Sequence, residues 1–150
     1  MRRTPFLALP AFLALVTGAI GCGDKSLTRA EYVKQADAIC KDFTERQDKL
    51  GKPKTLNEIE RLGAKTKSLA EEQLGKFRDL KAPEDIADDA KAYGDLTEKQ
   101  VTNIDELVGA AKTKDVKKIQ SVVTSASKLE SQADAKAEAI GLKVCGKNKS

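Results

Sequence analysis

The amino-acid sequence predicts an all-α protein, an antiparallel up-down-up-down four-helix bundle whose C-terminal tail folds back onto the first helix. Four segments repeat apolar residues at steps of three and four, which is the pattern of an amphipathic helix. The connections between them are short, so consecutive helices should be antiparallel neighbours. Aromatic residues make up only 4% of the chain, and Ala, Lys, Glu and Asp are abundant. This composition favours helices over strands.

Residues 1–21 are predicted to be a lipoprotein signal peptide that is absent from the mature protein. Two arginines follow the initiator methionine, and the uncharged apolar run over residues 6–20 is shorter than the roughly 20 residues that span a bilayer. The run ends in "AIGC", which resembles a bacterial lipobox with Cys22 as its cysteine. The alternative is an ordinary signal peptide with an incidental cysteine nearby.

A lipobox cysteine is thioether-linked to diacylglycerol and becomes the new N-terminus after cleavage. Two or more acyl chains give stable anchoring, whereas one gives marginal binding. We therefore expect lipid on Cys22 and a protein anchored to the cell membrane on its extracytoplasmic side. Residues 22–27 would form the lipidated tether, and residues 28–150 the four-helix bundle domain.

The chain has three cysteines, and lipid on Cys22 would leave Cys40 and Cys145. Disulfides are permitted outside the cytoplasm, so we expect these two to pair; the alternative is two buried free thiols. Cys40 lies about 18 Å along the first helix from the pole where both chain ends meet. The tail must therefore run back beside that helix, where Leu142 and Val144 are expected to seal it.

The first helix is expected over residues 28–50, with Thr28 and Glu31 forming a capping box and Gly51 ending the helix. The second is expected over residues 55–80, with a second capping box formed by Thr55 and Glu58. The predicted inner stripe of the first helix contains Val33, Ala36, Ile39, Cys40, Phe43 and Leu50. That of the second contains Leu56, Ile59, Leu62, Thr66, Leu69, Gln73, Phe77 and Leu80.

Gly63 and Gly75 interrupt the second helix, each at a cost of up to about 1 kcal/mol relative to Ala. They allow either close helix contact or a local bend.

The third helix is expected over residues 83–112, with Pro83 in its first turn, and the fourth over residues 115–140, ended by Gly141. The third predicted stripe contains Ile86, Ala90, Tyr93, Thr97, Gln100, Ile104, Leu107 and Ala111. The fourth contains Val116, Ile119, Val123, Ala126, Glu130, Ala133, Ala137 and Ile140. Glu130 is the one charged member, and we expect its carboxylate to reach water from a boundary position.

The stretches "LTRAEYVKQADAIC" and "AIGLKVCGKNKS", with "KAPED" and "AAKTKDVKKIQ" between them, resemble a group of small uncharacterised proteins. These are secreted or lipid-anchored proteins of high-GC Gram-positive (actinobacterial) bacteria, in which an "ADAIC" helix accompanies a terminal G-x-x-V-C-G. The resemblance covers most of residues 27–146. It implies an exported helical domain with one disulfide and implies no catalytic activity.

The sequence contains no catalytic or metal-binding motif that we recognise. Histidine is absent, which excludes Ser/His and Cys/His catalysis and histidine-based metal sites. The adjacent carboxylates Glu71–Glu72 and Asp88–Asp89 diverge by about 100 degrees on a helix, so they are expected to be solvated surface. We therefore predict no catalytic residues, no metal ligands and no cofactor.

The net charge is +4, and removal of the two signal-peptide arginines leaves +2. This near balance argues against nucleic acid as a partner. The expected function is a non-enzymatic, lipid-anchored helical module that binds an envelope protein or polymer or stabilises the envelope, and the protein is expected to be a monomer. The first alternative is a carrier that holds a small apolar ligand between its helices. An enzyme is the third and weakest reading.

Overall fold

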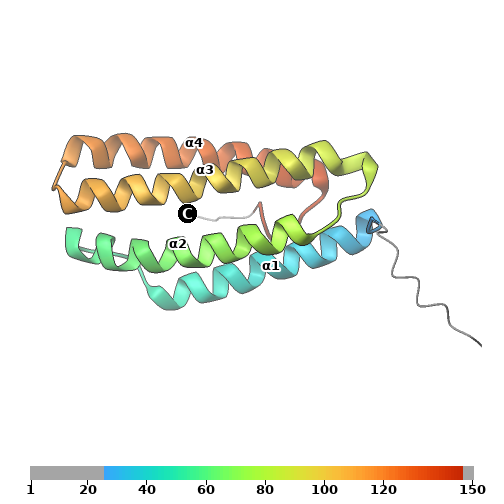
Figure 1. Ribbon diagram of the computed structural model, residues 1–150, viewed down its shortest axis with the longest axis horizontal. Helices are drawn as coiled ribbons and strands as arrows, with labels where there is room; N and C mark the ends of the chain where they lie inside the picture. The colour runs from blue at the N-terminus through green and yellow to red at the C-terminus, as the bar shows by residue number, and fades with distance from the viewer. Residues whose placement is uncertain (1–25, 147–150) are drawn as a thin grey trace, which may run out of the picture.

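The computed structural model describes residues 26–146, and this part of the chain contains helices and no strand. Its elements are α1 (Arg29–Leu50), α2 (Leu56–Asp79), the short 3-10 helix η1 (Glu84–Ile86), α3 (Ala87–Lys112) and α4 (Val116–Ile140). Figure 1 shows the four long helices lying side by side along the longest axis. The all-α prediction is confirmed. The predicted helices match the observed ones, except that residues 83–86 form η1 and its cap, ahead of α3.

The helix ends follow local sequence signals with one difference. At α1, the Thr28 side chain accepts from the Glu31 backbone N–H and the Glu31 carboxylate accepts in return, so this capping box is confirmed. At α2, Thr55 accepts from the Glu58 N–H, but the Glu58 carboxylate accepts from the backbone of Lys54. The second capping box is therefore only half formed, because the carboxylate reaches one residue further back.

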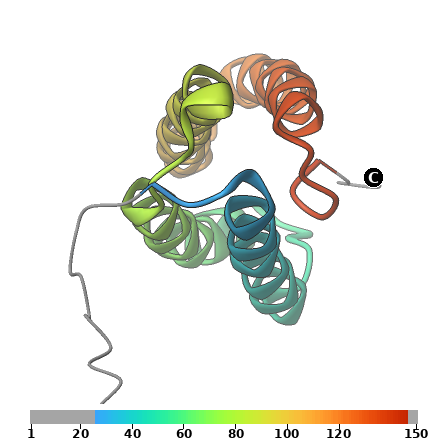
Figure 2. The same cartoon turned by 90° about the vertical axis from the view of Figure 1, so that its right-hand side faces the viewer.

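Most contacts between long helices join neighbours in the sequence: α1 packs on α2, α2 on α3 and α3 on α4. The end view in Figure 2 shows α1 and α2 on one side and α3 and α4 on the other, with the tail between α1 and α4. Direct contact between α1 and α4 is sparse. The Arg29 guanidinium donates to the carbonyl oxygens of Ala139 and Ile140, at 2.9 and 3.1 Å. The start of α1 and the end of α4 are thus tied together at one end of the molecule.

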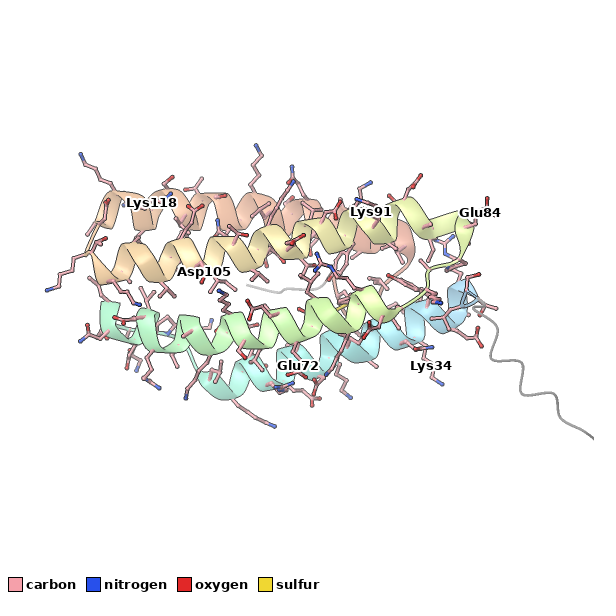
Figure 3. All side chains as sticks on the ribbon, in the orientation of Figure 1. Lys34, Glu72, Glu84, Lys91, Asp105 and Lys118 are labelled. Atoms are coloured by element: carbon pink, nitrogen blue, oxygen red, sulfur yellow. A yellow bond between two sulfur atoms is a disulfide. The ribbon has the colours of Figure 1, made fainter. Side chains whose placement is uncertain are left out.

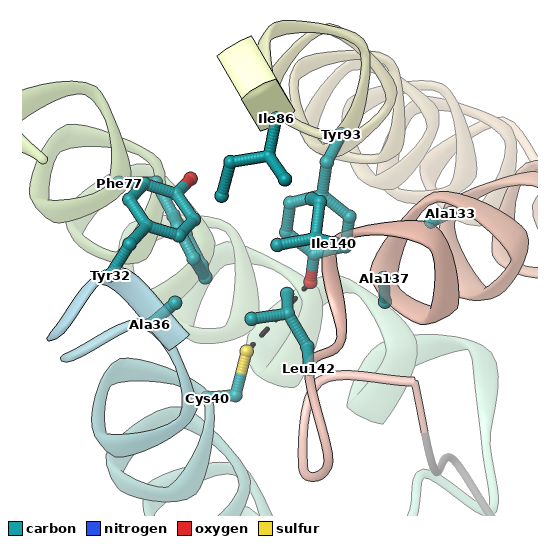
Figure 4. Packing of buried hydrophobic residues seen from close by; sticks show 10 residues of the cluster. All are labelled: Tyr32, Ala36, Cys40, Phe77, Ile86, Tyr93, Ala133, Ala137, Ile140 and Leu142. Atoms are coloured by element: carbon teal, nitrogen blue, oxygen red, sulfur yellow. Dashed lines mark hydrogen bonds between the residues drawn. The ribbon is translucent and has the colours of Figure 1, made fainter. Parts of the chain in front are cut away.

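The main hydrophobic cluster lies at this same end (Figure 4). Tyr32 and Ile140 are almost completely buried, and the rings of Phe77 and Tyr93 meet edge to face with centroids 5.2 Å apart. Such aromatic pairs contribute about 0.5–1.5 kcal/mol beyond the area they bury. The start of α1 and the ends of α2 and α4 therefore meet in this cluster.

The predicted inner stripes are correct in outline but wrong at the start of α4. Val116 and Val123 are 61% and 52% exposed, whereas Val122 is 2% exposed. Tyr32 and Leu74 are buried although neither was assigned to a stripe. The orientation of α4 follows its packing on α3, and α1 does not cover the other side of the predicted stripe. A stripe that would face inward in a closed bundle is therefore partly open to water.

Candidate functional site

The C-terminal tail is fixed to α1 by a disulfide and by backbone hydrogen bonds. Cys40 and Cys145 are joined, with their Cα atoms 5.2 Å apart, so the predicted pairing is confirmed and the free-thiol alternative is wrong. The Asp37 carboxylate, on α1, accepts from the backbone N–H groups of Lys143 and Val144 at 2.9 and 2.8 Å. The predicted fold-back of the tail is therefore observed.

The two predicted sealing residues of the tail behave differently. Leu142 is 8% exposed and joins the hydrophobic cluster, as expected. Val144 is 40% exposed, so its predicted sealing role is wrong. The backbone N–H of Val144 donates to Asp37, and the side chain remains partly exposed.

The disulfide adjoins two polar side chains from other helices. The Tyr93 hydroxyl lies 3.8 Å from Cys40 Sγ (dashed in Figure 4), and Gln73 Nε2 donates to the same sulfur at 3.6 Å. Burial raises the pKa of the Tyr93 phenol, which therefore stays protonated near neutral pH. These contacts place the disulfide at one end of a polar hollow.

A groove extends from the disulfide toward the opposite end of the molecule. It consists of three adjoining hollows that share lining residues, with volumes of about 60, 230 and 770 Å³ from the disulfide outward. Glu130 borders all three, so it lies at the middle of the groove. The far hollow lies beside the loop over residues 51–53, where α1 has little contact with α4. We call these three hollows together the α1–α4 groove.

Polar side chains line the middle of the α1–α4 groove without protein partners. Gln47, Gln100, Asn103 and Glu130 make no side-chain hydrogen bond or ion pair with any other residue in the range 26–146. None of them contains a buried nitrogen or oxygen atom that lacks a partner, so their polar groups reach solvent. The groove thus presents free donors and acceptors to whatever enters it.

The α1–α4 groove is acidic. Asp48, Glu130 and Asp134 line it, and Lys52 is the one cation among its lining residues in the described part of the chain. Burial raises the pKa of the Asp134 carboxyl, a sign that no cation compensates its loss of hydration. The groove therefore carries unbalanced negative charge on a protein whose net charge is positive.

Many acidic groups elsewhere are paired, in contrast to Glu130 and Asp134 (Figure 3 shows the side chains). Glu72 accepts from Arg46 at 2.8 Å and also pairs with Lys76 at 2.7 Å. The hydrogen bond from Arg46, followed by that from Lys76, lowers the pKa of Glu72 to about 2. Its neighbour Glu71 pairs with Lys67, and Asp89 pairs with Lys136. These adjacent carboxylates do not converge on one site.

The far hollow adds apolar surface from Ile59 and Leu62 on α2 and from Ile104 and Leu107 on α3. Gly63 also lies there, and a Cβ at this position would clash with Val108 Cγ2 on α3. Gly63 therefore permits close contact between α2 and α3, one of the two roles considered from the sequence. Gly75 has open space around its Cα and does not have this role.

Cys22, the predicted lipid attachment point, lies outside the described residues. Among residues 26–146, no group of three or more potential ligand residues is arranged to hold a metal ion. Within the same range, no helix combines the length and the apolar character that a bilayer crossing requires.

The sequence contains a signal for the groove, which is the occurrence of polar residues at positions that the amphipathic pattern assigns to the inner faces of the helices. Thr66, Gln73, Thr97, Gln100 and Glu130 occupy positions on the predicted inner stripes, and all five line the groove. Several polar residues at inner positions indicate an interior that remains accessible to water, because burial of polar groups without hydrogen-bond partners is unfavourable. Of these five residues, only Glu130 is singled out from the sequence, and it is expected at a boundary position. In the structure Glu130 is half-buried.

Comparison of the chain with protein-family models, with curated proteins and with solved structures gives no match. The chemistry of the α1–α4 groove and the sequence signals are therefore the basis for a functional proposal.

Proposed function

We propose that this chain is an extracytoplasmic lipoprotein, held at the membrane by lipid on Cys22, whose helical domain binds an envelope component without catalysing a reaction. The lipobox-like "AIGC" supports the anchor. The observation that carries the binding role is the α1–α4 groove, where the polar groups of Gln47, Gln100, Asn103 and Glu130 have no partner in the described chain.

The proposed topology is an antiparallel up-down-up-down bundle that is open along one side. Contacts between consecutive helices and the course of the ribbon in Figure 1 support this topology. The disulfide and the tail occupy the α1–α4 side near the chain ends, and the groove occupies the rest of that side. The tail would cover part of the open α1–α4 side and leave the part that forms the groove for a partner.

The position of the tether would place the far hollow away from the membrane. Leu27, the residue at the end of the proposed tether, donates its N–H to the carbonyl of Lys81 at 2.9 Å, at the same end of the molecule as the disulfide cluster. A helix of the length of α4 spans about 37 Å. A domain attached at Cys22 would therefore present the far hollow to the surrounding envelope.

Carriage of a small apolar ligand is the alternative function, and the far hollow of about 770 Å³ with its Ile and Leu side chains favours it. A volume in this range suits a drug-sized molecule. Two observations weigh on the other side: Gly63 accommodates Val108 instead of leaving space, and Gln47 and Asp48 share the lining. Native mass spectrometry would separate the two functions, since a carrier retains a co-purified apolar molecule.

Site-specific photo-crosslinking in intact cells tests the binding function. A photoreactive amino acid at Gln100, inside the groove, should give a discrete adduct of higher mass. The same group at Lys41, on the exposed side of α1, is the matched control and should give none. Absence of an adduct at Gln100, or the same adducts at both positions, would contradict the proposal.

A further inference from the structure

We propose that the ligand of the α1–α4 groove is a short extended peptide that carries one basic side chain next to apolar residues. This inference rests on the proposed binding function and specifies the chemistry of the partner. It follows from the charge, the hydrogen-bonding groups and the apolar surface of the groove, which occur in a fixed order along its length.

The negative charge of the groove would be balanced by a cation bound at its centre. Glu130 borders all three hollows and has no ion-pair partner in the described chain, and Asp134 follows one helical turn later on α4. The one lysine of the lining, Lys52, borders only the far hollow. A lysine or arginine side chain entering at Glu130 would neutralise a half-buried carboxylate and form a charge-assisted hydrogen bond.

The side-chain amides of the groove match the groups of a peptide backbone. Gln47, Gln100 and Asn103 each offer an NH₂ donor and a carbonyl acceptor, and none is used within residues 26–146. Gln73 uses its Nε2 on Cys40 Sγ but keeps its carbonyl oxygen. A peptide backbone alternates one donor with one acceptor, so it can satisfy amides on both walls of the groove.

The length and the apolar end of the groove set the size of the peptide. Eleven residues separate Leu62, in the far hollow, from Gln73, beside the disulfide, which corresponds to about 16 Å along α2. An extended chain covers this distance with about five residues. Its basic side chain would meet Glu130, and its apolar side chains would lie over Leu62 and Leu107.

The test uses sets of capped pentapeptides and the full-length ¹⁵N-labelled protein. Each peptide contains two leucines, two alanines and one lysine, and the lysine occupies each position in turn. A matched set carries acetyl-lysine, which has the same shape but no charge. Binding is followed by the side-chain NH₂ resonances of Gln47, Gln73, Gln100 and Asn103, which report contact inside the groove.

At least one lysine peptide should shift these resonances in a saturable manner, and its acetyl-lysine counterpart should bind at least about tenfold more weakly. Glu130→Gln, which preserves shape and removes the charge, should abolish the difference between the two peptides. Glu84→Gln, at the end of the molecule away from the far hollow (labelled in Figure 3), is the control and should change nothing. If Glu130→Gln does not fold, Gln100→Leu provides a second variant, and it should weaken binding of the lysine peptide severalfold.

Three results would overturn the inference: no peptide shifts the groove amides at millimolar concentration, lysine and acetyl-lysine peptides bind equally, or an uncharged oligosaccharide shifts the same resonances when the peptides do not. The proposed function fails separately. If photo-crosslinking at Gln100 captures a partner in cells while the peptides fail, the groove binds a component of different chemistry and only the peptide inference is lost.

Discussion

The Asp37 carboxylate accepts a hydrogen bond from the backbone N–H of Lys143 at 2.9 Å, across 106 positions of sequence. The same carboxylate also accepts from the N–H of Val144 at 2.8 Å. One side chain of α1 thus satisfies two backbone donors of a tail that has left helical geometry. Together with the disulfide, this contact fixes residues 143–145 on α1 at the point where the α1–α4 groove begins.

Replacement of Asp37 should loosen the tail. Asp37→Ala removes the acceptor for both backbone donors and should lower the free energy of unfolding by about 1–3 kcal/mol. Asp37→Asn keeps one acceptor oxygen and should cost less. Urea denaturation measures the stability, and hydrogen exchange at the amides of Lys143 and Val144 measures the tail directly. Asp79→Ala, at an exposed acid with no such contact, is the control and should stay within about 0.5 kcal/mol of the parent. Equal losses from both alanine variants would contradict this role.

The disulfide should contribute strongly to stability. The bond closes a loop with a sequence separation of 105 residues, for which the chain-entropy treatment gives about 4–5 kcal/mol before any effect of strain. The double variant Cys40→Ser with Cys145→Ser should lose stability on that scale in urea unfolding. Dithiothreitol should lower the parent to the same level and leave the double variant unchanged. A reductant effect of similar size in the double variant would show that another thiol is responsible.

The two glycines of α2 should respond in opposite directions to alanine. Gly63→Ala forces a Cβ into Val108 Cγ2 and should destabilise the protein by about 1–3 kcal/mol. Gly75→Ala adds a Cβ in open space and should stabilise it by up to about 1 kcal/mol through helix propensity. Thermal and urea unfolding measure both. Val108→Ala in the Gly63→Ala background should restore part of the loss, and failure of this rescue would argue against close α2–α3 contact at Gly63.

Acid should weaken the contact that Glu72 makes between α1 and α2. Hydrogen bonds from Arg46 and Lys76 lower the pKa of Glu72 from 4.5 to about 2. Because the folded-state pKa is the lower one, the stabilisation is fully present above pH 4.5 and is lost as the pH falls toward 2. Glu72→Gln should therefore flatten the fall in unfolding midpoint over this window. An unchanged pH dependence in Glu72→Gln would contradict this role of Glu72.

The sequence predicted local structure better than it predicted shape. The Thr28 cap, the Gly51 and Gly141 stops and the Cys40–Cys145 pairing depend on neighbouring residues or on residue counting, and all are observed. The exposure of Val123 could not be read from periodicity, because it depends on how far α1 lies from α4. A heptad-like stripe predicts that a face is apolar and does not say whether another helix covers it.

The candidate site was only partly visible in the sequence for a related reason. Its residues come from four helices, and no two of them form a motif along the chain. Gln73 and Gln100 were placed on inner stripes, yet an amide at one such position is compatible with a packed core. Their significance emerges when the fold gathers them around Glu130, where Gln100 has no partner in the described chain and Gln73 bonds only to Cys40 Sγ.

We propose that the protein is held at the membrane through lipid on Cys22, while the Cys40–Cys145 disulfide fixes the tail to α1. Intact-mass analysis of the protein from the membrane fraction tests this most directly. The account predicts a chain that begins at Cys22, carries the added mass of a diacylglycerol with or without a further acyl chain, and lacks the two hydrogens lost in one disulfide. An uncleaved chain, or one cleaved elsewhere and free of lipid, would contradict it.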